Sequence, residues 1–253
     1  MGEAVLGGVV RLVVGWLYPD QMNIYGDRGN ITILAGRARA RGVEVDVRRI
    51  GTGPADGVDD AQLLFVGGGQ DRDQELVFQD LVDHKAERLR AAVDRGAVVL
   101  AVCGGYQLLG HHYLTGEGRR LPGLGLLDAH TEAGATRCIG DIVLDADPAL
   151  GLEPRTLVGF ENHSGRTFLG PGARPLGTVR AGWGNNGEDR TEGAICGDTL
   201  FGTYVHGSLL PKNPQLADFL LERALGAPLP PLHDELELAA HRRMVERTLQ
   251  RAR

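Results

Sequence analysis

One cysteine in this sequence stands where enzymes commonly place a nucleophile. The segment "VVLAVCGGYQLLG", residues 98–110, passes from branched apolar residues into Cys103, two glycines and a helix-like stretch. A cysteine by itself is more often a small buried hydrophobe. A strand that ends in a nucleophile-type residue and turns at once into a helix, however, forms a strained elbow that presents the side chain at the sheet edge. The helix N-terminus lowers the pKa of a thiol, so we expect Cys103 to be reactive at neutral pH.

A second glycine-rich strand end is suited to assist such a nucleophile. In "FVGGGQDRD", residues 65–73, three glycines follow an apolar run. The stretch has neither the lysine of a GxxxxGK[ST] phosphate loop nor GxGxxG spacing, so an oxyanion hole is the better interpretation. We expect the backbone N–H groups of Gly69 and Gly104 to converge on a developing negative oxygen beside Cys103. The triple glycine, Gly67 to Gly69, also leaves the loop free to move, and we expect a partner to set its final form.

A thiolate nucleophile needs a proton shuttle, and His206 is the best placed of the eight histidines. The segment "DTLFGTYVHGSLL", residues 198–210, predicts a strand that ends at His206, from where an imidazole reaches a neighbouring strand end. His130 and His163 lie in predicted loops, and their roles stay open between structure and function. Solvated faces explain the others, which are His84, His111, His112, His233 and His241.

Alternating strands and helices are predicted to hold these residues together. Short apolar runs indicate strands at residues 9–17, 43–50, 61–68 and 97–105, with helical patterns between them at 29–42 and 74–95. This order predicts an α/β fold, with a mostly parallel sheet covered by helices on both faces and right-handed crossovers. Function in such sheets lies at the C-terminal ends of the strands, where Cys103 and the glycine loop stand.

Composition narrows the possible functions. The chain has 253 residues, of which 42% are hydrophobic, and a formal net charge of -6, so it can bury a full core and has no basic excess for nucleic acid. The start "MGEAVLGGVVRLVVGWL" lacks a basic lead and is broken by glycines, which favours a strand over a signal peptide. We expect a cytoplasmic protein. The three cysteines form no pair and no CxxC motif, so neither disulfides nor a metal site are expected.

Several dispersed motifs carry a family resemblance. The elbow "CGGYQLLG", the late "TYVHGSLL" and the "GGGQD" loop resemble the class I glutamine amidotransferases, in particular the cobyric-acid-synthase-like branch. The segments "LYPDQMNIYGDRGN", "FVGGGQDRDQ" and "FENHSGRT" are similar more narrowly to the GatD subfamily, the glutaminase subunits of lipid II isoglutaminyl synthases. The resemblance implies a flavodoxin-like glutaminase domain over residues 1–225, followed by a helical extension over residues 226–253.

The resemblance also implies a reaction and a partner. Cys103 would attack the side-chain amide of L-glutamine, while Gly69 and Gly104 hold the tetrahedral oxyanion. His206 would protonate the departing ammonia and then activate the water that hydrolyses the thioester. The ammonia would pass to a MurT-like Mur ligase subunit, which amidates the D-glutamate of the lipid II stem peptide to D-isoglutamine. ATP and Mg²⁺ are expected on that partner and no cofactor in this chain.

Two further residues are assigned to the substrate. Arg137, in "GATRCIGD", matches the position at which the resemblance suggests a glutamine-binding arginine, since a guanidinium fork suits the free α-carboxylate. Its alternative is a solvated loop cation. Gln107 lies one helical turn after Cys103, where it either lines the pocket or packs.

The sequence departs from the wider family at one place. Typical members carry His-x-Glu, in which the carboxylate fixes the imidazole tautomer, but Ser208 stands at the acid position here. We therefore expect a Cys-His dyad, with His206 oriented by a backbone carbonyl or by Glu161, and weak activity in isolation. Cys138 and Cys196 are interpreted as inert packing residues.

Other segments and other functions stay open. The C-terminal segment 226–253 predicts a weakly amphipathic helix that packs on the domain or docks a partner, and the polar segment 181–194 predicts a mobile surface loop. The alternative functions are a cobyrinate- or cobyrate-type amidotransferase subunit, a PfpI-like hydrolase or binding module with the same cysteine elbow, and a non-catalytic scaffold in which Cys103 is only packed.

Overall fold

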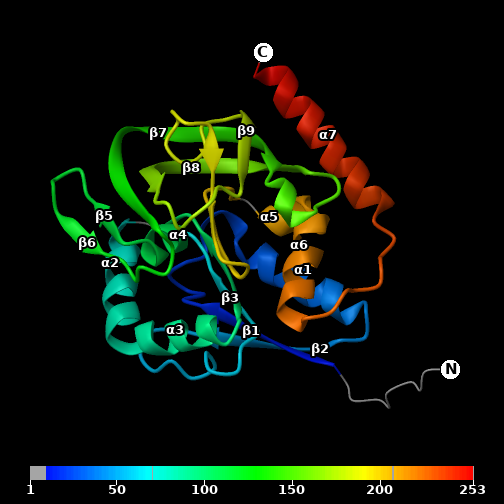
Figure 1. Ribbon diagram of the computed structural model, residues 1–253, viewed down its shortest axis with the longest axis horizontal. Helices are drawn as coiled ribbons and strands as arrows, with labels where there is room; N and C mark the ends of the chain where they lie inside the picture. Colours follow the sequence, from blue (N-terminus) through cyan, green and yellow to red (C-terminus); the bar gives the residue numbers. More distant parts are fainter. Residues whose placement is uncertain (1–9, 70, 207, 253) are drawn as a thin grey trace.

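A six-stranded sheet forms the centre of the computed structural model, which describes residues 10–69, 71–206 and 208–252. Its order is β11-β12-β4-β3-β1-β2, in which only β11 is antiparallel to its neighbour (Figure 1). The strands are β1 (Arg11–Leu17), β2 (Glu44–Ile50), β3 (Leu63–Val66), β4 (Val98–Val102), β11 (Ala194–Cys196) and β12 (Leu200–Thr203). The four strands predicted from the first hundred residues are confirmed, although residue 9 lies outside the described part of the chain.

Helices lie on both sides of this sheet, as predicted. On one side α1 (Arg28–Arg39) packs against α5 (Leu209–Lys212) and α6 (Pro214–Leu225), while α2 (Asp71–Asp80), α3 (Ala86–Asp94) and α4 (Gly104–Leu109) lie on the other (Figure 1). A π-helical turn, Leu81–Lys85, joins α2 to α3. Because both faces are covered, β3 and β4 are buried at every residue, which explains their uninterrupted apolar sequence.

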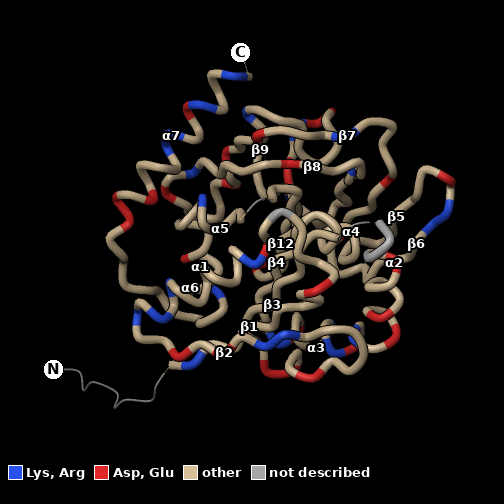
Figure 2. The backbone as a smooth tube through the Cα atoms, turned by 180° about the vertical axis from the view of Figure 1, so that it is seen from behind, with Lys and Arg blue, Asp and Glu red and all other residues tan. Residues whose placement is uncertain are grey.

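Ion pairs connect α1 to the C-terminal helices. Arg37 is buried and donates to both Asp218, at 2.6 Å, and Asp234, while Arg41 also reaches Asp218. Asp218 lies on α6, and Asp234 immediately precedes α7 (Glu235–Arg251). Charged residues are otherwise spread over many elements, with both signs in view (Figure 2).

A second sheet was not predicted. It runs β10-β9-β7-β5-β6, with β8 paired to β7, and is mostly antiparallel. Its strands are β5 (His112–Leu114), β6 (Arg120–Pro122), β7 (Ala129–Ala146), β8 (Thr156–Leu169), β9 (Gly177–Ala181) and β10 (Thr191–Glu192). The long β7–β8 hairpin crosses one end of the molecule (Figure 1). Residue 206 joins it through an isolated bridge to Phe160 of β8, so the second sheet touches the predicted site.

The strand predicted for residues 198–210 is shorter than expected, because β12 ends at Thr203. The backbone amides that follow Thr203 would continue the hydrogen bonds between strands, but side chains accept from them instead. The Thr203 hydroxyl accepts from the Val205 amide at 3.0 Å, and the Glu192 carboxylate accepts from the Tyr204 amide at 2.8 Å. His206 therefore follows the strand end by three residues, and its amide donates to the Phe160 carbonyl at 2.6 Å.

The C-terminal segment forms the predicted helix, α7, which lies against the outer face of the second sheet. Val245 packs there with Val143, Val158 and Ala181 in a small separate apolar cluster. His241, which was predicted to lie on a solvated face, is instead buried, and its ring contacts the Thr156 hydroxyl at 2.8 Å. Throughout the described residues, helices of the length and apolarity that a membrane span requires are absent.

The segment predicted as a mobile surface loop, residues 181–194, is exposed at residues 187–190 but buried at residues 184–186 and 192–194. Asn185 and Asn186 are buried, and the Asn185 side chain donates to the Gly193 carbonyl and accepts from the Gly193 amide, both at 2.9 Å. Trp183 is 45% exposed. Polar side chains of this glycine-rich segment thus form buried hydrogen bonds.

Candidate active site

Cys103 sits at a strained elbow between β4 and α4. Its backbone has φ of 51° and ψ of -105°, a conformation that is costly for a residue with a Cβ and persists only when its surroundings enforce it. One enforcing contact is the Cys103 amide, which donates to the Thr203 carbonyl at 2.8 Å. This is the geometry predicted for a nucleophile at the C-terminal end of a strand.

A cavity of about 480 Å³ opens beside this cysteine. It is lined by residues of the second sheet and of the loops and helices that follow the central strands, which are Ile24, Gly68, Gly69, Gln74, Cys103, Gln107, Tyr113, Arg137, Asn162, His163, Ser164 and His206. Five of the six site residues predicted from the sequence therefore line one cavity. The sixth, Gly104, is the first residue of α4, and a Cβ there would lie 2.4 Å from the Gln74 amide nitrogen.

His206 is the histidine beside the cysteine. A Cβ built on Gly68 would lie 3.1 Å from Cε1 of His206 and 3.3 Å from Cβ of Cys103, so the two side chains flank this glycine. Burial, together with the charges of His163 and Arg137, lowers the pKa of His206 from 6.5 to about 3, whereas the Asn162 backbone favours the charged form. The ring is therefore neutral at pH 7 and able to accept a proton from the thiol.

The glycine loop is closely packed, which corrects the expectation of a free loop. A Cβ on Gly67 would lie 2.4 Å from the Met22 carbonyl oxygen, and a Cβ on Gly69 would lie 2.4 Å from the Met22 sulfur. The Gly68 carbonyl also accepts from the Ile24 amide at 3.1 Å. Gly67 and Gly69 are required by close approach of the segment around Met22, since no side chain fits there, whereas Gly68 faces Cys103 and His206.

Arg137 projects into the cavity from an irregular part of β7. The register of β7 against β8 shifts between Ala133 and Cys138, and such bulges redirect side chains. The Arg137 guanidinium donates to the Asn162 side-chain oxygen at 3.0 Å and to its carbonyl at 3.4 Å. Arg137 thus stands in the same cavity as Cys103, with its guanidinium held by the neutral residue Asn162.

Gln107 lies on the cavity wall and is held from behind by a buried polar network. Its amide nitrogen donates to the Tyr204 hydroxyl at 3.1 Å, and that hydroxyl is 2.7 Å from the Thr167 hydroxyl. Because the nitrogen is bound inward, the amide oxygen is the group of Gln107 left for the cavity. Gln107 both lines the pocket and packs, so the two alternatives raised for it are compatible.

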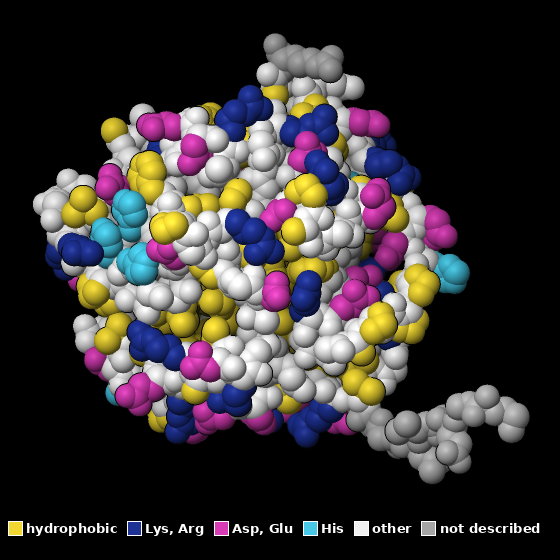
Figure 3. Space-filling model, in the orientation of Figure 1, with side chains coloured by type: hydrophobic (Ala, Val, Ile, Leu, Met, Phe, Trp, Pro, Cys, Tyr) yellow, Lys and Arg dark blue, Asp and Glu magenta, His cyan; other side chains and the backbone are white. Residues whose placement is uncertain are grey.

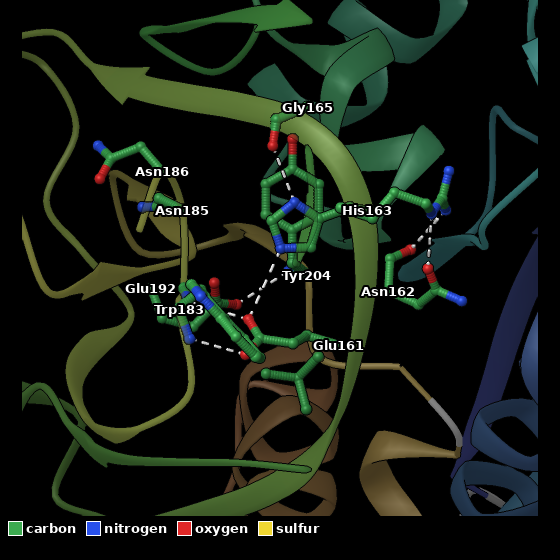
Figure 4. A network of polar contacts seen from close by, with 12 residues as sticks. Glu161, Asn162, His163, Gly165, Trp183, Asn185, Asn186, Glu192 and Tyr204 are labelled. Atoms are coloured by element: carbon green, nitrogen blue, oxygen red, sulfur yellow. Dashed lines mark hydrogen bonds and ion pairs between the residues drawn. The ribbon is translucent and has the colours of Figure 1, made fainter. Parts of the chain in front are cut away.

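His163 belongs to this same network, as Figure 4 shows. Its Nδ1 donates a hydrogen bond to the Gly165 carbonyl at 2.8 Å, and its ring stacks on Tyr204 with centroids 3.7 Å apart. Its Nε2 lies 3.6 Å from Glu161, whose carboxylate accepts from the amides of Trp183 and Gly184. These contacts hold the His163 ring in place within the cavity wall.

Glu161, and Ser208 at the acid position of the wider family, make other contacts. The Glu161 carboxylate accepts from the backbone amides of Trp183 and Gly184 and lies 3.6 Å from His163. Ser208 directs its hydroxyl to the Gly26 carbonyl at 2.9 Å and lies against Gly29 of α1. The hydrogen bond of the His206 ring with the Asn162 backbone agrees with the alternative in which a backbone carbonyl orients the ring.

The other histidines and cysteines lie apart from this cavity. Histidine side chains gather on the surface over β5 and β6 (Figure 3), where the rings of His112 and His130 stack with centroids 5.3 Å apart. Cys138 is buried on β7, and burial raises the pKa of its thiol. Cys196 is half-buried on β11 and accepts from the Asp128 amide at 3.3 Å. Within the described chain, no cluster of His, Cys, Asp and Glu side chains is arranged to hold a metal ion.

Sequence reasoning missed four residues that complete the site. Gln74, Asn162 and Ser164 line the cavity, and Asp27 accepts a hydrogen bond from the Gly68 amide at 2.9 Å. Asp27 and Gln74 stand inside quoted motifs, "YGDRGN" and "GGGQDRDQ", but polar residues that flank glycines are common in turns. The available signal was therefore their nearness in sequence to the glycine loop, which does not assign a role.

Comparisons with known proteins agree with this architecture. Residues 13–214 match the CobB/CobQ-like glutamine amidotransferase domain. A glutamine amidotransferase of known structure has a TM-score of 0.58 at 20% identity over 86% of this chain and 99% of its own, and PurLQS from Thermotoga maritima has a TM-score of 0.57 at 16% identity over 87% and 96%. These structural likenesses support a glutamine-amidotransferase-like, flavodoxin-type fold.

Relatives found by their sequences share a higher identity with this chain than these solved structures do. Subunit GatD of the glutamine-hydrolysing lipid II isoglutaminyl synthase of Staphylococcus aureus is 42% identical over 94% of this chain and 96% of its own length. The corresponding subunit of Streptococcus pneumoniae is 39% identical over 85% and 81%. A cobyric acid synthase of Pelotomaculum thermopropionicum is 34% identical over 57% of this chain but only 29% of its own length. With the matched domain spanning most of the chain, this protein belongs to the CobB/CobQ-like glutamine amidotransferase family.

Proposed function

We propose that this chain is the glutaminase subunit of a lipid II isoglutaminyl synthase. The observation that carries the proposal is the placement of Cys103 and His206 on either side of Gly68, in one cavity with Arg137. The relatives named for this reaction match along most of the chain, whereas cobyric acid synthase matches over a minor part of its own length. The same cavity therefore supports L-glutamine as the substrate.

The first half of the reaction forms a thioester. Arg137 holds the α-carboxylate of glutamine, and Gln107 contributes its amide oxygen to the pocket. Neutral His206 takes the proton of the Cys103 thiol, and the sulfur bonds to the side-chain amide carbon. Backbone N–H groups at Gly69 and Gly104 hold the resulting oxyanion. His206 then returns the proton to the leaving nitrogen, the C–N bond breaks, and ammonia departs.

The second half hydrolyses the thioester. A water molecule gives a proton to His206 while its oxygen bonds to the thioester carbon, and the same backbone N–H groups hold the second oxyanion. The C–S bond then breaks, the proton returns to the sulfur, and glutamate leaves. The ammonia passes to a MurT-like Mur ligase subunit in a heterodimer. That subunit binds ATP and Mg²⁺ and amidates the D-glutamate of the lipid II stem peptide to D-isoglutamine in the cytoplasm.

Reconstitution tests this function. The chain is purified alone and with the Mur-ligase-like protein encoded beside it, and ammonia release from L-glutamine is measured together with amidation of lipid II. We expect slow release alone, faster release in the complex, and ATP-dependent amidation that stops when glutamine is withheld. Glutamine hydrolysis with amidation of a corrinoid acid instead would favour the cobyrate-type alternative. No ammonia release in either form would favour a PfpI-like or scaffold role.

A further inference from the structure

The Asp27 side chain accepts a hydrogen bond from outside the helix that it precedes. Aspartate at the start of a helix normally caps it by accepting from an amide of the first turn. Asp27 immediately precedes α1 but makes no such cap, and Asn23 instead accepts from the Arg28 amide at 2.9 Å. The Asp27 carboxylate turns away from its own helix and accepts from the Gly68 amide at 2.9 Å.

The position of this carboxylate ties it to the cavity. Asp27 is 0% exposed, and its Oδ2 would lie 3.6 Å from a Cβ on Gly68, the same point that is flanked by Cys103 and His206. The Gly68 peptide is thus held on both sides, by Asp27 at its amide and by the Ile24 amide at its carbonyl. The second carboxylate oxygen, Oδ1, is buried and has no hydrogen-bond partner among the described residues.

We propose that Asp27 is a positioning residue of the glutaminase, which fixes the Gly68 peptide and thereby aims the Gly69 N–H at the oxyanion. This inference rests on the proposed function and adds a residue to it. A buried carboxylate is costly, and burial raises the pKa of Asp27 to about 7. Asparagine or serine would cap the helix and threonine or leucine would fill the space at lower cost. The free-energy cost of burying this carboxylate is explained if a hydrogen-bond acceptor is needed to hold the Gly68 amide.

The position of Gly68 affects the transition state more than the bound substrate. Gly69 follows directly in the chain, so a rotation of the Gly68 peptide moves the next amide, while Arg137 holds the substrate from β7. An oxyanion donor acts only when negative charge develops on the oxygen. Loss of the Asp27 acceptor should therefore lower kcat and leave KM nearly unchanged.

The test compares Asp27→Ala, which removes the acceptor, with Asp27→Asn, which keeps an oxygen for Gly68, in the complex with the synthetase subunit. We expect kcat for ammonia release to fall by about 10²-fold in Asp27→Ala, the scale for one oxyanion donor, with KM within about threefold. Asp27→Asn should restore most of the lost kcat. Asp20→Ala is the matched control, because Asp20 lies on the same segment, 72% exposed and paired with Arg49.

A second readout does not depend on turnover. Hydrogen exchange of the Gly68 amide should be slow in the wild type and in Asp27→Asn, and faster in Asp27→Ala. If the wild type releases no ammonia, the proposed function fails while this exchange still reports on Asp27. Wild-type kcat in Asp27→Ala, an equal loss in both variants, or a rise in KM that accounts for the loss would each overturn the inference. Failure of Asp27→Ala and Asp27→Leu to fold, with Asp27→Asn folded, would also overturn it by assigning Asp27 to the fold.

Discussion

The backbone amide of Cys103 donates a hydrogen bond of 2.8 Å to the carbonyl oxygen of Thr203, where β4 and β12 run side by side in the parallel sheet. Thr203 precedes His206 by three residues, so this bond brings the nucleophile and the histidine segment to the same sheet edge. It joins backbone atoms alone. Side chains at the site can therefore be replaced without removing the contact that holds the two segments together.

Replacement of the nucleophile is the first test. Cys103→Ala should abolish ammonia release from glutamine, because no other group in the mechanism can form the thioester. The circular dichroism spectrum should stay unchanged, since only the sulfur is lost. Cys138→Ala, a buried cysteine on β7 outside the cavity lining, and Cys196→Ala should stay active. Ammonia release by Cys103→Ala at the wild-type rate would remove the central claim.

The two cavity histidines should differ in their effects. His206→Ala should slow turnover by about 10²-fold or more, the scale for a lost general acid-base group. His163→Ala should mainly lower the melting temperature, because it removes the stacking on Tyr204 and the Gly165 hydrogen bond. Steady-state kinetics and thermal unfolding of both variants measure the difference. A larger kinetic loss in His163→Ala would mean that the proton shuttle is assigned to the wrong histidine.

Arg137 should act on substrate binding. Arg137→Ala should raise KM for glutamine by about tenfold or more, because a charged hydrogen bond contributes about 1.5–3 kcal/mol. Arg137→Lys should recover only part of this, since an ammonium lacks the planar fork. Arg180→Ala on β9 is the control, because Arg180 pairs with Asp145 at 3.6 Å and lies outside the cavity lining. An unchanged KM in Arg137→Ala would identify Arg137 as a solvated cation.

The buried carboxylate of Asp27 predicts a pH-dependent stability. Its pKa is raised from 3.8 to about 7 in the folded chain, so the folded state holds this proton more tightly than the unfolded state and loses stability as pH rises from about 4 to 7. At about 1.4 kcal/mol per pH unit, the cost reaches about 4 kcal/mol above pH 7. Asp27→Asn should therefore gain stability relative to the wild type across this range and level off above it.

Urea unfolding at pH 4, 5.5, 7 and 8 measures this gap. Asp20→Asn, at an exposed carboxylate on the same segment, shows the change that loss of a surface charge produces. A stability difference between Asp27→Asn and the wild type that is constant with pH would show that Asp27 does not take up a proton in this range.

The sequence alone determined most strands of the central sheet and the place of Cys103 at the end of one of them. Continuous apolar runs broken by glycine-terminated helical patterns are local signals, because strands covered on both faces need apolar residues at every position. Cys103 could be placed at the end of β4 for the same reason, since strand, glycines and helix follow one another within a few residues. The family resemblance supplied Arg137, and the helical spacing after Cys103 supplied Gln107, as residues that line the cavity.

The tertiary structure decided what lies around the nucleophile. The end of β12 at Thr203 depends on Glu192, and the orientation of His206 depends on Phe160 and Asn162 of β8, all distant in sequence. The second sheet could not be read from alternation, because β7 and β8 are long, polar at many positions and irregular in register. The triple glycine predicted a loop that is free to move, whereas in the structure Gly67 and Gly69 are closely packed against Met22. The role of Asp27 could not be predicted from the sequence either, because its partner Gly68 lies 41 residues away. Only folding brings the Asp27 carboxylate and the Gly68 amide to 2.9 Å from each other.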